Sequence, residues 1–86
     1  MNTIYKVAIN RKAAKYLKRI DHSTRKRIIA ALEGLKLRPP MGDIAPMKGM
    51  PGYYRLRVGS YRAIFYVDHN EKIIYIRTIA PRGNVY

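Results

Sequence analysis

The hydrophobic positions follow two different periods along the chain, a helical period in the first half and a strand period in the second. Residues 3–9 (TIYKVAI) precede both and are rich in β-branched and aromatic residues, which is typical of a strand. Two apolar stripes at helical spacing follow and predict helices from about residue 10 to 20 and from about residue 24 to 37. The residues of these stripes are Ala13, Ala14, Leu17 and Ile20 in the first and Ile28, Ile29, Leu32 and Leu35 in the second.

Polar residues with a known capping preference mark the ends of both predicted helices. Asn10 can cap the first helix, and either Asp21 or Ser23 can cap the second. The sequence Arg38-Pro39-Pro40 ends the second helix, because proline cannot continue it. Since the break between the helices is short, we expect them to form an antiparallel helical hairpin.

The second half of the chain reads as a loop followed by three strands. Residues 38–52 (RPPMGDIAPMKGMPG) hold four of the five prolines and three glycines, so we expect a loop there. Strand-like runs follow at residues 53–58, 61–67 and 72–79, with turns at Gly59-Ser60 and at residues 68–71. The order β-α-α-β-β-β over residues 1–86 predicts one small α+β domain, in which an antiparallel sheet carries the helical hairpin on one face.

Alternation divides the hairpin at residues 53–66 (YYRLRVGSYRAIFY) into an apolar face and a basic face. The basic face carries Arg55, Arg57 and Arg62, flanked by Tyr53 and Tyr66. The residues of the apolar face, which can receive the helices, are Tyr54, Leu56, Val58, Tyr61, Ala63 and Phe65. The cross-strand pairs predicted from a two-residue turn are Val58 with Tyr61, Arg57 with Arg62, Leu56 with Ala63, and Arg55 with Ile64.

The charge balance indicates a polyanionic partner. Eighteen Lys and Arg against five Asp and Glu give a net charge of +13 on 86 residues. Such a balance is typical of proteins that bind nucleic acid, an anionic membrane or an acidic protein, although a solvated basic surface is the plainer alternative. The sequence has no acid between Asp43 and Asp68, and Lys48 and the three hairpin arginines fall in that gap. We therefore expect no carboxylate near the arginines.

Several classes of protein are disfavoured by the sequence. Cysteine is absent, which excludes disulfides and thiolate chemistry, and the scattered acids predict neither a metal site nor another cofactor. No apolar run reaches the roughly 18 residues of a membrane span, and the N-terminus lacks the pattern of a secretory signal. We expect a soluble, cytoplasmic protein with no membrane partner. His22 and His69 fall in predicted turns, so we expect surface positions for them rather than a catalytic pair.

The basic face of the hairpin can be either a solvated surface or a preformed anion site. Like charges directly opposite each other destabilise a sheet, and a bound phosphate would relieve that repulsion. Arginine suits a phosphate because its fork donates two parallel hydrogen bonds and keeps its charge. Tyr53 and Tyr66 can stack on bases. Lys48 and Arg77 are further candidates for contacts with RNA or phosphate.

The stretch MKGMPGYYRLRVGSYRAIFYV, followed by a strand and then PRGNVY, resembles the RelE branch of the RelE/ParE toxin superfamily. The predicted order of elements agrees, so the likeness covers essentially the whole chain. It implies the toxin of a type II toxin–antitoxin system, which enters the A site of the 70S ribosome and cleaves the mRNA there. It also implies a cognate antitoxin, RelB-like or of another class, that neutralises the toxin.

The resemblance implies a role for each residue that matches the family's motif. The 2′-hydroxyl of the RNA attacks the adjacent phosphate and leaves a 2′,3′-cyclic phosphate and a 5′-hydroxyl. Arg62 matches the arginine that stabilises the pentavalent phosphate, Arg82 an arginine near the leaving oxygen, and Tyr86 a tyrosine that contacts or deprotonates the nucleophile. Arg55 and Arg57 match basic strand residues that are lysines in some relatives. Since arginine does not release its proton, the general base is Tyr86 or catalysis is mainly electrostatic.

Two other functions fit the same likeness. A ParE-like toxin would inhibit DNA gyrase without cutting RNA, although the arginine cluster with Arg82 and Tyr86 favours the nuclease. A degenerate member would only bind RNA or its antitoxin. The exposed side of the predicted helices is expected either to contact the ribosome or to be simply solvated, and its basic residues are Arg11, Lys12, Lys15, Lys18, Arg19 and Arg25.

Overall fold

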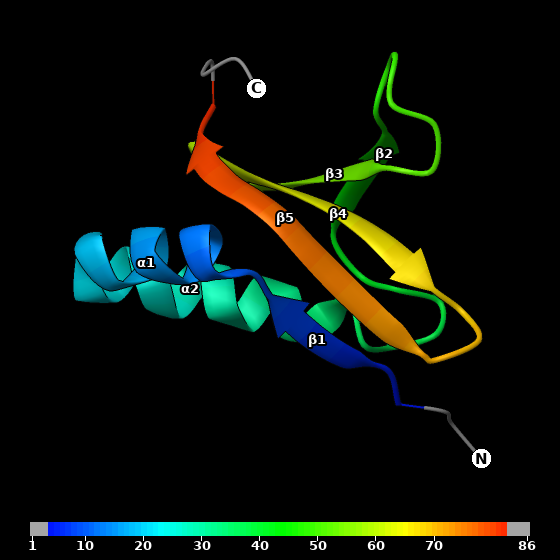
Figure 1. The fold of residues 1–86 in the computed structure, drawn as a ribbon. Coiled ribbons are helices and arrows are strands. Elements are labelled where there is room, and N and C mark those ends of the chain that lie inside the picture. Colours follow the sequence, from blue (N-terminus) through cyan, green and yellow to red (C-terminus); the bar gives the residue numbers. More distant parts are fainter. Residues whose placement is uncertain (1–3, 83–86) are drawn as a thin grey trace.

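A computed structural model describes residues 4–82, which form two helices and a five-stranded sheet. The elements in chain order are β1 (Lys6–Ile9), α1 (Arg11–Arg19), α2 (His22–Gly34), β2 (Asp43–Pro46), β3 (Tyr54–Val58), β4 (Tyr61–Asp68) and β5 (Ile73–Pro81). Figure 1 shows α1 and α2 lying side by side along one face of the sheet. The predicted α+β class and the helical hairpin are confirmed, and the opposite face of the sheet carries no helix of the described chain.

The sheet is mixed, so the prediction of an entirely antiparallel sheet is wrong. Its strand order is β1-β5-β4-β3-β2, and β1 pairs with β5 in parallel, with Ala8 beside Tyr75. The other three pairings are antiparallel. A tight turn forces its two strands to run in opposite directions, but no such turn joins β1 to β5. Their relative direction therefore depends on the path of the whole chain, which the local pattern does not reveal.

The second correction concerns residues 38–52, which contain a strand as well as loops. Residues Asp43–Pro46 form β2 at the edge of the sheet and pair with β3. Proline is tolerated at a sheet edge because its missing N–H faces away from the ladder. The flanking prolines and glycines masked this four-residue strand in the sequence.

The core lies between the helical hairpin and the sheet. Ile28 and Leu32 of α2 pack with Leu56 of β3, which has no exposed surface, and with the central strands. Ile29 was expected in the core but is 43% exposed, because the buried stripe of α2 runs through residues 28, 32 and 35. The buried core residues are Tyr5, Ala13, Leu17, Ile28, Leu32, Leu35, Leu56, Ala63, Phe65, Ile74, Ile76 and Ile79.

Side-chain caps hold the two helices at their N-terminal ends. The Asn10 Oδ1 accepts a hydrogen bond from the Ala13 amide at 2.8 Å, and the Asp21 Oδ2 accepts one from the Thr24 amide at 3.0 Å. Asp21 is thus the second cap, and the hydroxyl and amide of Thr24, together with Ser23, lower its pKa to about 2. The second helix begins at His22 and ends at Gly34, earlier at both ends than predicted. His22 is therefore an exposed helical residue, whereas His69 is an exposed turn residue as expected.

Candidate nucleic-acid interface

The β3–β4 hairpin has the register that the sequence predicts. Arg57 lies opposite Arg62, and Arg55 lies opposite Ile64. Leu56 and Ala63, also paired, are buried under the helices, so alternation directs the three arginines to the open face. Gly59 has a φ of 57°, a left-handed conformation that glycine adopts readily and that allows the tight turn.

A carboxylate does lie beside the arginines, so the expectation of an acid-free cluster is wrong. The Asp43 Oδ1 is 3.7 Å from the Arg55 Nη1, and its Oδ2 is 3.4 Å from the Arg57 Nε. The cause is β2, whose pairing with β3 places Asp43 opposite Arg57. Because the Asp43 side chain is 59% exposed, water and salt screen its attraction, and each pair contributes about 1 kcal/mol or less. The three arginines and Asp43 together keep a positive charge.

Arg55 is the most enclosed of the ion-paired arginines. Its side chain is 17% exposed, against 41% for Arg57. The Arg55 Nη1 is buried and donates no hydrogen bond to the described part of the protein. Ile64, opposite Arg55, is only 1% exposed. A buried guanidinium N–H without a hydrogen-bond acceptor is costly, and the Asp43 carboxylate at 3.7 Å offsets part of that cost by charge attraction alone.

Two further arginines lie at the Gly59-Ser60 turn. The backbone N–H of Arg82 donates to the Ser60 carbonyl at 2.6 Å, and its Nη1 approaches the Gly59 carbonyl at 3.5 Å. The Nη2 of Arg27, from α2, lies where a Cβ at residue 59 would be. Arg82 was expected at the site. Arg27 was not, because nothing in the spacing of α2 shows that its side chain reaches this turn.

Aromatic rings form a ladder across the open face. The Tyr53 and Tyr66 ring centroids are 5.2 Å apart, and those of Tyr66 and Tyr75 are 5.0 Å apart and stacked. The Arg77 Cζ lies 5.4 Å from the centroid of Tyr53. The sequence predicts a role at the site for Tyr53, Tyr66 and Arg77, but for Tyr75 it predicts only a place in a strand. Pairing of β4 with β5 places Tyr75 beside Tyr66, and that pairing register was not predicted.

The remaining predicted site residues lie apart from the arginine cluster. Lys48 is exposed in the loop between β2 and β3. Arg25 is half-buried, and its Nη1 donates to the Leu17 and Ile20 carbonyls at 3.1 Å each, so it holds the end of α1. Tyr86 lies outside the described residues. The exposed basic residues of α1 are Arg11, Lys12, Lys15, Lys18 and Arg19.

Neither a metal centre nor a membrane span is found in the described part of the protein. Between residues 4 and 82, no three His, Asp or Glu side chains gather closely enough to hold an ion. Over the same range, neither helix has the length and the apolar character needed to cross a bilayer.

A family profile described as the ParE toxin of the type II toxin–antitoxin system parDE matches residues 7–86. The chain belongs to this family of toxins. RelE1 of Methanocaldococcus jannaschii is 33% identical over 85 residues, a length that covers 95% of this chain and 94% of that protein. The predicted membership of the RelE/ParE superfamily is confirmed, with a RelE-like toxin as the branch that its relatives indicate.

Solved structures of RelE-like toxins share the fold. The archaeal RelE of Pyrococcus horikoshii, crystallised with RelB, has a TM-score of 0.80 at 27% identity, covering 96% of this chain and all of that one. The RelE of Methanococcus jannaschii, also crystallised with RelB, has a TM-score of 0.69 at 30% identity, covering 86% of this chain and 88% of that one. The E. coli toxin RelE, at 17% identity, has a TM-score of 0.78 over 94% of this chain and 86% of its own, which shows the fold alone.

Proposed function

We propose that this RelE-like toxin is a ribosome-dependent endoribonuclease that cleaves mRNA in the A site. The observation that carries the proposal is the open sheet face on which Arg55, Arg57 and Arg62 are aligned, with Arg82 at the adjoining turn. This face combines a net positive charge with a row of tyrosine rings, of which Tyr66 is exposed and Tyr53 and Tyr75 are half-buried. Positive charge and aromatic rings are the two features with which proteins bind single-stranded nucleic acid.

In the proposed reaction the RNA supplies its own nucleophile. The 2′-oxygen forms a bond to phosphorus while the bond from phosphorus to the 5′-oxygen breaks, giving a 2′,3′-cyclic phosphate and a 5′-hydroxyl. The proton of the 2′-hydroxyl goes to a base, and the leaving oxygen gains a proton. Catalysis of such a step relies largely on holding the in-line geometry and on stabilising charge at the phosphate.

The roles of the arginines are taken from the positions that they match in the motif of RelE-like toxins. Arg62 is proposed to stabilise the pentavalent phosphate, and Arg82 to lie near the leaving 5′-oxygen. Arg55 and Arg57 are proposed to hold the backbone, since an arginine can donate two parallel hydrogen bonds but does not act as a base. Tyr86 remains the candidate for the proton transfer at the 2′-hydroxyl.

Two partners follow from this proposal. The exposed basic face of α1 is proposed to contact ribosomal RNA, where Lys and Arg neutralise phosphates. A cognate antitoxin is the second partner, because RelE relatives were crystallised with RelB and because the charge of +13 favours an acidic protein.

The test is Arg62→Ala, compared with Lys26→Ala as an exposed cation outside the proposed site. Each protein is expressed briefly, and the 5′ ends of cellular mRNA are mapped. Arg62→Ala is expected to lower A-site cleavage at least about 100-fold, the effect of losing one group that stabilises transition-state charge, whereas Lys26→Ala retains it. Circular dichroism and melting curves check that both variants fold. Full cleavage by a folded Arg62→Ala protein would contradict the proposal.

Inhibition of DNA gyrase is a second candidate, because the matching family profile is that of ParE. Purified protein would then inhibit DNA supercoiling by gyrase and would leave ribosome-bound mRNA intact. Running both assays on the same preparation separates the two functions.

A further inference from the structure

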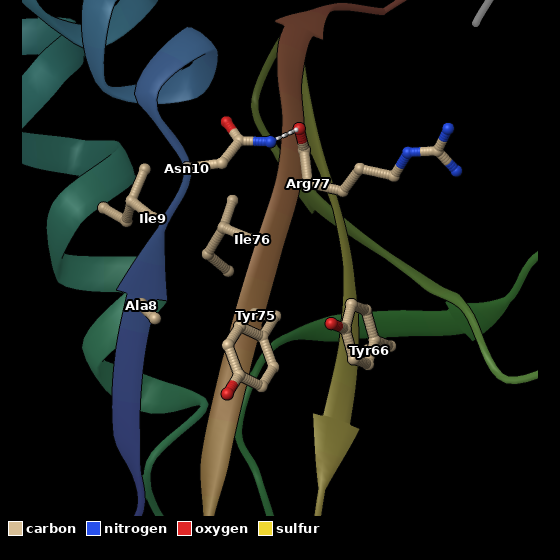
Figure 2. Close-up of a pocket in the computed structure, with 7 residues that line it drawn as sticks. All are labelled: Ala8, Ile9, Asn10, Tyr66, Tyr75, Ile76 and Arg77. Carbon is tan, nitrogen blue, oxygen red and sulfur yellow. Dashed lines mark hydrogen bonds between the residues drawn. The ribbon is translucent and has the colours of Figure 1, made fainter.

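A cavity of about 310 Å³ opens beside the aromatic ladder, at the end formed by β1 and β5. The residues that line it are Tyr66, Tyr75, Ile76 and Arg77 of β4 and β5, Ala8 and Ile9 of β1, and Asn10, the N-cap of α1. Figure 2 shows the Tyr75 ring between Ala8 on one side and Tyr66 on the other. The cavity is therefore continuous with the ladder and not a separate hollow.

The cavity exists because the ladder ends on a small residue. The rings of Tyr53, just before β3, Tyr66 of β4 and Tyr75 of β5 follow one another across the sheet. The next residue in this row is Ala8, which is the partner of Tyr75 in the parallel pairing of β1 with β5. A methyl group there leaves one side of the Tyr75 ring without an aromatic neighbour. The cavity lies on that side of the Tyr75 ring, where a further ring would extend the row.

We propose that this space is a nucleobase subsite, in which a base of bound RNA stacks beside Tyr75 and extends the ladder. Every base has a flat π-face, so stacking on tyrosine accepts any sequence. The net charge of +13 and the arginines on the same open face favour RNA as the occupant over an apolar ligand. The inference rests on the proposed RNA cleavage and adds a place for a particular nucleotide.

Asn10 is held at the rim of the cavity and can contact the edge of that base. Its Nδ2 donates to the Arg77 carbonyl at 2.8 Å, as Figure 2 shows, and its Oδ1 accepts from the Ala13 amide. An amide group has two N–H donors, so the second can serve the ligand. The hydrogen bonds to the backbone fix the orientation of Asn10 before RNA arrives.

The base in the subsite is not the one at the scissile phosphate. Tyr66 follows Arg62 by four residues along β4, which is about 13 Å at about 3.3 Å per residue. The subsite lies further across the sheet, beyond Tyr75 toward β1, so it is more than about 13 Å from the proposed reaction centre. The nucleotide bound there flanks the cleaved bond and anchors the strand.

The experiment measures the binding of short RNAs that are 2′-O-methylated throughout, so that cleavage is blocked. One base at a time is replaced by an abasic unit, and affinity is measured for wild type, Tyr75→Ala, Tyr75→Phe and Ala8→Phe. Ala8→Phe places a ring in the cavity without removing the ladder. Tyr54→Ala is the matched control, because the Tyr54 ring is also stacked, on Phe65, but lies on the helix side of the sheet.

One abasic position is expected to weaken wild-type binding by about tenfold, which is typical of losing one base–aromatic stack. The same position should have little effect on Tyr75→Ala and Ala8→Phe, while Tyr75→Phe and Tyr54→Ala behave like wild type. Equal abasic penalties in all variants, or no penalty at any position, would overturn the proposal. So would an Ala8→Phe protein that loses antitoxin binding but binds RNA normally, since a protein side chain would then be the occupant.

Mapping of cellular 5′ ends tests the cleavage separately. If wild type does not cut mRNA but one abasic penalty depends on Tyr75, the nuclease proposal fails and the subsite stands. If wild type cuts mRNA but no penalty depends on Tyr75, the subsite alone fails.

Discussion

Asp43 lowers the net positive charge of the arginine cluster, although it lies on a different strand, β2. It reaches Arg55 and Arg57 from a neighbouring strand, at 3.7 and 3.4 Å. An acid at this place lowers the repulsion between the cations when no RNA is bound. Under the proposed function it would also repel an incoming phosphate, so the residue that stabilises the free site would lower the affinity of the site for RNA.

Asp43→Asn is accordingly expected to raise the affinity for single-stranded RNA about two- to fivefold in low salt, the range of one screened ion pair. The gain should shrink in 1 M salt, where the screening length falls to about 3 Å. Fluorescence anisotropy at several salt concentrations measures it. Glu71→Gln, an exposed acid in the turn before β5, controls for the change in total charge. An equal gain in both variants would refute a local effect of Asp43.

At the scale of the elements, the features that could be predicted from the sequence are those that depend on residues close together in the chain. Asn10 and the register of Arg57 with Arg62 were predictable, because a cap and a tight turn depend on neighbours in sequence. The strand β2 was not, since it has only four residues and is stabilised by pairing with β3. Because β2 was not predicted, Asp43 was not predicted to lie beside the arginines either. Tyr75 was missed for a related reason, because the pairing of β4 with β5 shifts register between Ile64 and Phe65.

The cap of α2 gives the protein a dependence of stability on acid pH. The hydrogen bonds from Thr24 and Ser23 lower the pKa of Asp21 to about 2, against about 3.9 in an unfolded chain. A lowered pKa means that the contribution of this carboxylate is complete above the unfolded value and is lost as the pH falls toward 2.

Asp21→Ser provides the comparison, because serine also caps a helix but does not titrate. Between pH 5 and pH 2, wild type is expected to lose stability relative to Asp21→Ser, as followed by urea unfolding at each pH. Parallel pH profiles of the two proteins would show that Asp21 contributes nothing to the acid sensitivity.

At the scale of the molecule, the helices and sheet depend on one apolar layer. Leu56 has no exposed surface, and its substitution by alanine is expected to lower the free energy of unfolding by about 2–5 kcal/mol. Ile29→Ala, at a position 43% exposed, should cost about 1 kcal/mol or less. Urea unfolding of both variants measures the two losses of unfolding free energy. Similar losses would contradict a core in which Leu56 is buried and Ile29 is not.

The overall topology was predictable only in part. The spacing of the apolar residues predicted the helices and the strands β3, β4 and β5. The short connections between them predicted the helical hairpin and the antiparallel meander. The parallel pairing of β1 with β5 brings together residues that are far apart in sequence, such as Val7 and Ile74. No short turn joins these two strands, so their pairing could not be predicted from a local signal. The proposed nucleobase subsite lies against this contact, so it could not be predicted from local sequence patterns.

Both outer strands of the described sheet are short, with four residues each, while β4 has eight and β5 nine. Pro46 further interrupts the outer edge of β2, because it has no N–H to offer. Each edge of the sheet therefore offers few unpaired backbone N–H and C=O groups to a strand of a neighbouring molecule. The sheet is thus protected against edge-to-edge polymerisation, and a copy that separates from its partner can stay a single, available molecule.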